Sequence, residues 1–176
     1  MNLSSDDLNK VMYRQSQKNL IPYYLGTLSS DEVEISIYEN RPYKELECCF
    51  ITNYDTSNES GSHWVGFMLP NNDGKDNNGR DMVPKYFDSF GFAPDNDDKI
   101  LNDITHFKDF LTDVAPNRAY WYNKFDYQSL DATTCGAWSA VWISRGGGNI
   151  SPAQNIDNSQ ERDKWVVKKY DSLKRI

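Results

Sequence analysis

The stretch CGAWSAVWIS at residues 135–144 is apolar on nearly every side of a helix. A helix without a polar face has to lie inside the protein, so this stretch predicts a central, buried helix. It begins at Cys135, after the polar residues 131–134, and the glycines at 146–148 end it. The thiol is therefore expected at a helix N-terminus, where unpaired N–H groups and the helix dipole lower the pKa of a cysteine.

The segments before and after this helix alternate between helix and strand patterns. Helices are predicted at residues 4–18, at 95–114 and from about Asn158 onward, the last with Glu161 completing a capping box. Strands are predicted at 33–37, 47–52, 63–69, 83–88 and 119–125. Residues 20–27 contain Pro22 and Gly26 and are expected to be irregular, and 53–62 and 71–80 are expected to be polar connections.

Length and charge exclude several classes of protein. With 176 residues the chain is expected to form one domain, 1–176. The net charge of −7 argues against a broad nucleic-acid-binding face, which requires clustered positive charge. No stretch approaches the roughly 20 apolar residues of a membrane span, and the polar residues 1–10 predict no signal peptide. A basic cluster near the C-terminus is interpreted as a solvated helix face.

The cysteines argue against a disulfide framework. There are three, and Cys48 and Cys49 are adjacent, so in a strand they point to opposite faces. A reducing compartment is therefore expected. Neither a Cys-x-x-Cys nor a His-x-x-x-His spacing occurs, and we predict no metal ion and no cofactor.

Four residues, in the order His63, Asp88, Gln128 and Cys135, supply the groups of a cysteine hydrolase. Each alone has an ordinary explanation, as a hydrogen-bonded histidine, a strand-end acid, a loop amide and a small buried side chain. Together they provide a general base, a carboxylate that orients it, an oxyanion donor and a nucleophile. Gly136 lets a substrate carbonyl approach the backbone closely.

Four motifs in order extend this interpretation to most of the chain, about residues 6–145. They are PYYLGT at 22–27, GSHW at 61–64, YFDSFGF at 86–92, and Gln128 followed seven residues later by Cys135-Gly136. With them the chain resembles the adenain family, the maturation cysteine proteases of adenoviruses, and their relatives in virophages and virus-like transposons. More distant kin are the proteases for SUMO and ubiquitin-like proteins.

The resemblance implies an α+β fold, with a central, mostly antiparallel or mixed sheet flanked by helices and the nucleophile on a packed helix. It implies a viral endopeptidase that cleaves capsid or core precursors, at sites containing glycine, in the virion and the reducing interior of the host cell. Cys135 would attack, His63 would act as base, and Gln128 would hold the oxyanion together with the Cys135 N–H. Trp64 either packs beside the imidazole and shields it or is a plain core residue.

The chain also departs from the adenoviral pattern. Asp88 stands where adenoviral members carry Glu, and residues 116–119 contain no thiol that could tether an activating peptide. Any peptide activator should therefore bind non-covalently. From the net charge of −7 we expect no need for nucleic acid, and we also expect a monomer. Two alternatives stay open: a deubiquitinase or deSUMOylase-like isopeptidase, and a catalytically silent capsid-binding module, against which the complete set of four residues argues.

Overall fold

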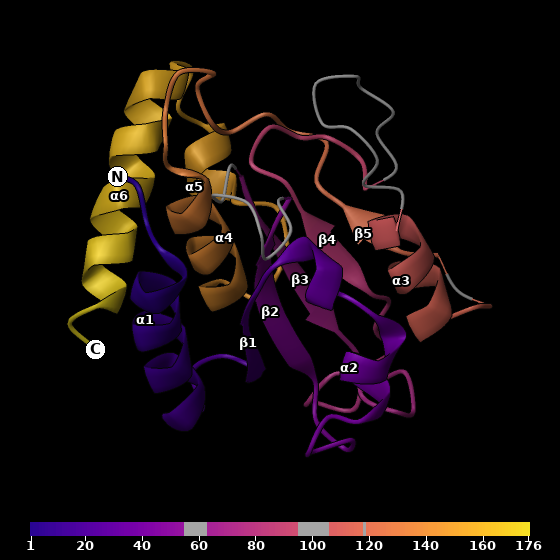
Figure 1. Cartoon of the computed structure of the whole chain (residues 1–176). Helices are drawn as coiled ribbons and strands as arrows, with labels where there is room; N and C mark the ends of the chain where they lie inside the picture. The colour runs from indigo at the N-terminus through magenta and orange to yellow at the C-terminus, as the bar shows by residue number, and fades with distance from the viewer. Residues whose placement is uncertain (55–62, 95–105, 118) are drawn as a thin grey trace.

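The computed structural model describes residues 1–54, 63–94, 106–117 and 119–176 (Figure 1). Within these residues the strands form one sheet in the order β1-β2-β3-β4-β5. The strands are β1 (Tyr23–Leu28), β2 (Cys48–Asn53), β3 (Trp64–Leu69), β4 (Lys85–Phe87) and β5 (Trp121–Tyr122). The α-helices are α1 (Ser5–Gln17), α2 (Ile35–Glu39), α3 (His106–Val114), α4 (Cys135–Ser144), α5 (Ser151–Gln154) and α6 (Ser159–Leu173).

The sheet is mixed, with an antiparallel centre. β3 pairs antiparallel with both β2 and β4, whereas the outer pairs β1–β2 and β4–β5 are parallel. Opposite β3, Asn53 of β2 faces Trp64, and Phe87 of β4 faces Gly66. The end of β2, the start of β3 and the end of β4 therefore meet at one end of the sheet. The predicted α+β fold is confirmed.

Helices cover both faces of the sheet. Figure 1 shows α1, α4 and α6 on one side and α2 and α3 on the other. Because neighbouring strand residues point to opposite faces, β2 contributes to both layers and is buried throughout. Cys49 packs in the core under α1, α4 and α6, while Cys48 packs with the side chains of α2 and α3. The predicted opposite orientation of the two thiols is confirmed.

The predicted central helix is α4, and it lies directly on β3. Trp138 and Trp142 are completely buried. The approach is close because Gly66 has no side chain: a Cβ there would lie 3.0 Å from Cε3 of Trp142. This packing sets the position of α4 along the sheet, and it brings the first residue of the helix, Cys135, next to the start of β3.

Two predictions near the N-terminus are wrong. Residues 20–27, expected to be irregular, contain strand β1, which accommodates Gly26 in a bulge with a positive φ of 132°. Residues 33–37, expected to be a strand, follow a 3-10 turn (Ser30–Glu32) and contain the start of α2. A capping box causes this, because the Ser29 N–H donates to Oε1 of Glu32 at 2.9 Å and starts a helical turn that the short alternating pattern hid.

Other elements differ from prediction in length. Strand β4 is shorter than 83–88 because Pro84 has no N–H for the ladder, and β5 occupies only two residues of 119–125. Helix α6 is capped by Asn158 as predicted, but the Glu161 carboxylate pairs with Lys164 Nζ at 3.0 Å and does not close the predicted box. Helix α5 was not predicted. Of the predicted helix 95–114 and loop 53–62, residues 95–105 and 55–62 lie outside the described residues.

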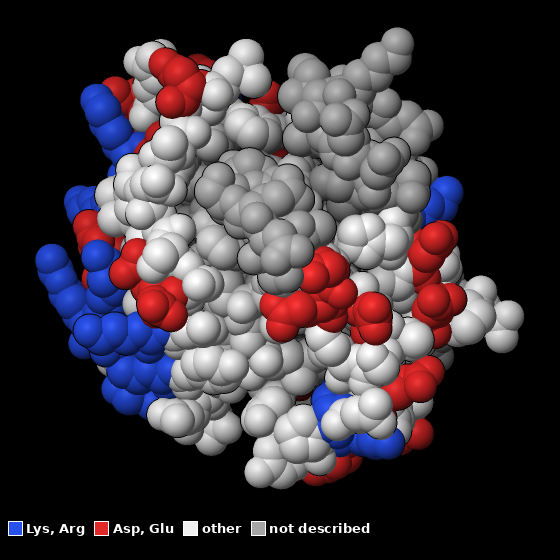
Figure 2. Space-filling view, in the orientation of Figure 1, with Lys and Arg blue, Asp and Glu red and all other residues white. Residues whose placement is uncertain are grey.

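Several exposed basic residues gather over α6. Figure 2 shows Lys and Arg side chains over the region where α6 lies, with acidic side chains across much of the remaining face. Lys164, Lys168 and Lys169 of α6 are all exposed. No helix among the described residues has both the length and the apolar character needed to cross a membrane.

Candidate active site

His63 and Asp88 form a buried pair at the end of the sheet where β3 begins and β4 ends. The imidazole Nε2 lies 2.9 Å from Oδ1 of Asp88, and the side chains are 7% and 0% exposed. Since Nε2 is engaged by the carboxylate, Nδ1 is the ring nitrogen left to face the thiol. The structure thus brings together two of the four residues that the sequence singled out.

Asp88 is held on every side. Phe90 donates its N–H to Oδ1 at 2.9 Å, and the Tyr54 hydroxyl donates to Oδ2. The Asn123 side chain fixes the backbone of Asp88, accepting from its N–H at 3.0 Å and donating to its C=O at 2.6 Å. The sequence analysis missed Tyr54 and Asn123, because nothing in the local pattern distinguishes them from ordinary residues after a strand.

The imidazole of His63 lies between aromatic rings. Phe90 stacks on it with ring centroids 5.0 Å apart, and Tyr54 lies at 4.8 Å. The Trp64 ring is fixed by its Nε1–H, which donates to the C=O of Leu3 at 2.9 Å. It lies against Gly136, where a Cβ would be only 3.1 Å from Cδ1 of Trp64. Trp64 and Gly136 therefore touch each other beside the thiol.

Cys135 is the first residue of α4 and is 8% exposed. The N–H of Trp64 points at its sulfur from 3.4 Å, and the His63 side chain also hydrogen-bonds to it. Burial raises the pKa of this thiol. The hydrogen bond and charge of His63 and the N–H groups of Trp64 and Gly136 outweigh burial and lower the pKa below its usual value.

The pKa of His63 shifts in the opposite direction, upward. Burial lowers its pKa, but the charge and hydrogen bond of Asp88 and the interaction with Cys135 outweigh burial and raise the pKa from 6.5 to about 10. Both changes favour one state of the pair, a thiolate beside an imidazolium. That state supplies a nucleophile and a proton donor.

The other two thiols are placed for packing. Burial raises the pKa of Cys48 to about 12 and raises that of Cys49 well above its usual range. The Cys49 thiol donates to the C=O of Pro22 at 3.4 Å. Of the three free cysteines, Cys135 alone has the environment of a reactive thiolate.

Gln128 is buried between two segments of the site. Its Oε1 accepts from the Ser89 hydroxyl at 2.6 Å, and its Nε2 donates to the C=O of Ala132 at 2.7 Å. Ser89 follows Asp88, and Ala132 lies in the loop that leads to Cys135. Since an amide NH₂ has two donors, the contact with Ala132 leaves a second N–H for a ligand.

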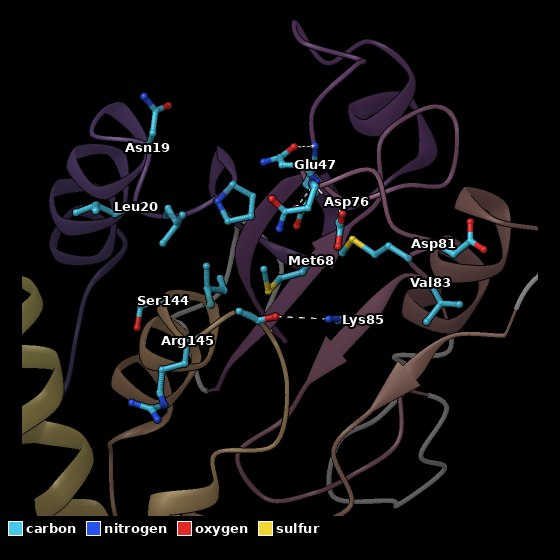
Figure 3. A pocket seen from close by; sticks show the side chains of 17 residues that line it. Asn19, Leu20, Glu47, Met68, Asp76, Asp81, Val83, Lys85, Ser144 and Arg145 are labelled. Carbon is cyan, nitrogen blue, oxygen red and sulfur yellow. Dashed lines mark hydrogen bonds between the residues drawn. The ribbon is translucent and has the colours of Figure 1, made fainter.

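A cavity of about 700 Å³ lies at the opposite end of the sheet (Figure 3). Glu47 before β2, Met68 near the end of β3, Lys85 at the start of β4 and Gly146 after α4 line it. None of the four candidate residues does. Hydrogen bonds and charge arrangement, not cavity size, therefore locate the active site. Among the described residues, no group of three His, Cys, Asp or Glu side chains could hold a metal ion.

The chain is similar in sequence to a viral protein and in fold to several solved structures. It is 30% identical over 154 residues to a putative thiol protease of Acanthamoeba polyphaga mimivirus, covering 81% of this chain and 47% of that protein. Its structure matches the ASFV protease with a TM-score of 0.53 at 15% identity, over 92% of this chain and 64% of the other. The chain has a cysteine-protease fold.

The chain is also similar in fold to the central domain of an uncharacterized Legionella pneumophila protein, with a TM-score of 0.52 at 15% identity over 99% of both chains. No profile of a known protein family matches the chain. The chain spans about half the length of its mimivirus relative.

Proposed function

We propose that this protein is a cysteine endopeptidase of the adenain type. The observation that carries the proposal is the joint arrangement of His63, Asp88 and Cys135. The thiol has a lowered pKa, the imidazole a raised one, and a buried carboxylate lies 2.9 Å from the ring. The viral relative and the protease fold support the same reaction class.

The chemistry follows from the ion pair. The Cys135 thiolate attacks the peptide carbonyl, a C–S bond forms, and the carbonyl π electrons move to the oxygen. The free N–H of Gln128 and the Cys135 N–H hold this oxyanion. His63 gives its proton to the departing amine as the C–N bond breaks. A water molecule, deprotonated by His63, then releases the acyl group, while Asp88 keeps the ring oriented.

The substrates we propose are capsid or core precursor polypeptides cut at sites containing glycine, within the virion or the reducing host interior. The narrow contact between Trp64 and Gly136 supports a preference for small residues, because little room remains beside the sulfur. The same narrowness suits the Gly-Gly tail of a ubiquitin-like protein, so an isopeptidase is the second candidate. We further propose that the enzyme acts as a monomer and that a peptide activator, if present, binds non-covalently.

The test is cleavage of a proteome-derived peptide library, with the new N-termini mapped by mass spectrometry. The wild-type protein should cut with glycine enriched beside the scissile bond, and Cys135→Ala should not cut. Cys48→Ala is the matched control, because it removes a buried thiol far from His63 and should stay active. Hydrolysis of ubiquitin-like C-terminal amides alone would favour the isopeptidase. Undiminished cleavage by Cys135→Ala would sink the assignment.

A further inference from the structure

Asp163, on the C-terminal helix α6, accepts hydrogen bonds from the segment that leads into the candidate nucleophile. Its Oδ1 accepts from the Thr134 hydroxyl at 2.7 Å and from Nε1 of Trp138 at 3.0 Å. Its Oδ2 accepts from the N–H and the hydroxyl of Ser129, at 3.1 and 2.6 Å. The side chain lies among these donors and the residue is only 8% exposed. Four donors on one buried carboxylate make it the junction between α6, the 129–134 loop and α4.

The bond to Thr134 has a particular consequence for α4. Thr134 is the residue that precedes the helix, and a threonine there ordinarily accepts a hydrogen bond from a first-turn N–H. Here its side chain makes no such bond, and its backbone has φ −97° and ψ 6° rather than the extended conformation of a capping residue. The hydroxyl is oriented toward Asp163, to which it donates, and in this orientation its oxygen accepts from none of the first-turn N–H groups of α4.

Those N–H groups are the ones the proposed chemistry needs. The Gly136 N–H contributes to lowering the pKa of Cys135, and the Cys135 N–H is the proposed partner of Gln128 at the oxyanion. A capping hydroxyl would place an oxygen acceptor among these donors and weaken their field at the sulfur. The same carboxylate also fixes Ser129, which adjoins Gln128 in the chain.

From this geometry we propose that Asp163 is a positioning residue that keeps the N-terminus of α4 uncapped and its N–H groups directed at the thiolate and the oxyanion. It acts through Thr134 and the 129–134 loop and touches no substrate. This inference rests on the proposed function. It explains why a helix remote in sequence, at the C-terminal end of the chain, bears on the chemistry of Cys135.

The experiment measures the rate of Cys135 alkylation by iodoacetamide against pH, which needs no substrate. In Asp163→Asn the amide cannot accept from all four donors, and Thr134 is free to turn and cap α4. The thiol profile should move to higher pH, the alkylation rate at pH 6 should fall about tenfold, and kcat should fall with little change in KM. Asp171→Asn is the matched control. It removes a carboxylate from the same helix and the same hollow, which Lys164, Lys168 and Arg175 also line, but leaves the bond to Thr134 intact.

The decisive variant is Asp163→Asn combined with Thr134→Val, which has no hydroxyl to cap the helix. Recovery of the alkylation profile in this double variant would support the proposal. An Asp163→Asn protein that is folded by circular dichroism and has the wild-type profile would overturn it, as would a shifted profile that Thr134→Val fails to restore. If Asp163→Asn does not fold, Asp163→Ser carries the same expectation, because the smaller side chain leaves room for water to satisfy the stranded donors. If the wild-type protein shows the expected alkylation profile but no peptidase activity, the proposed function is contradicted. The role of Asp163 in setting the reactivity of Cys135 is not.

Discussion

The hydroxyl of Tyr54 donates to Oδ2 of Asp88, the carboxylate oxygen that His63 does not contact. The carboxylate is thereby fixed at both oxygens, and the imidazole is bonded to a group that cannot rotate. Tyr54 in turn lies 3.3 Å from the hydroxyl of Tyr86, which makes no direct bond to Asp88. The candidate triad is therefore the inner part of a larger buried network.

Removing one hydroxyl tests this network. Tyr54→Phe keeps the ring against His63 but frees one oxygen of Asp88, so the imidazole should lose part of its orientation. We expect kcat to fall about tenfold with KM nearly unchanged, the usual result of losing a bond that matters only in the transition state. Tyr86→Phe is the matched control and should have a much smaller effect on kcat. Equal losses in the two variants would mean that the hydroxyls serve packing alone.

The thiolate–imidazolium pair predicts a broad pH optimum. On the acid side, kcat/KM should rise as Cys135 ionises, below the ordinary thiol value of 9.0, because its pKa is lowered. On the alkaline side, kcat/KM should fall as pH passes through about 10, where His63 loses its proton. The two limbs belong to the coupled pair and not to single residues. A rise in kcat/KM centred at or above pH 9.0 would indicate that the pKa of Cys135 is not lowered.

Kinetic measurements can distinguish whether Gln128 is an oxyanion donor or a substrate-binding residue. Gln128→Ala should reduce kcat about 10²–10³-fold and leave KM largely unchanged, because an oxyanion donor acts on the transition state. Its loss also frees the Ser89 hydroxyl and the Ala132 C=O, so the melting temperature should be measured beside the rate. If only KM rose, Gln128 would be a substrate-binding residue.

Activity is expected without nucleic acid. The net charge is −7, and polyanion binding scales with the number of phosphates that basic side chains neutralise. The exposed lysines of α6 form a candidate patch in the view of Figure 2. Peptidase assays under reducing conditions, with and without duplex DNA across a salt series, should give equal rates. A large, salt-sensitive stimulation that disappears in Lys164→Glu/Lys168→Glu would contradict this expectation.

The sequence was most informative where a pattern was long or chemically unusual. The unbroken apolar run of α4 predicted a buried helix with Cys135 at its start, and the structure has both. The adjacent thiols of Cys48 and Cys49 in β2 were correctly assigned to opposite faces. Short alternating segments misled, because residues 33–37 contain too few positions to separate a strand from a capped turn. A bulge likewise allowed a strand to form across Gly26.

The remote supports of the site left no trace in the sequence. Asp163 stands between Arg162 and Lys164 in a charged helix and resembles any solvated acid, and only the packing of α6 turns it inward. Asn123 and Tyr54 lie in segments whose meeting with Asp88 depends on the register of three strands. Such contacts between distant parts of the chain follow from tertiary packing, which local residue patterns do not encode.

The separation of the three thiols has a consequence for oxidative damage. Cys48 and Cys49 pair with Leu69 and Met68, at the other end of β3 from Trp64, whose N–H contacts Cys135, so neither is placed to form a disulfide with Cys135. Mild peroxide should therefore convert Cys135 to a sulfenic acid without a resolving partner in the same molecule. A small thiol should restore activity at that stage. Longer exposure should carry the sulfur to the sulfinic acid, from which no small thiol recovers it.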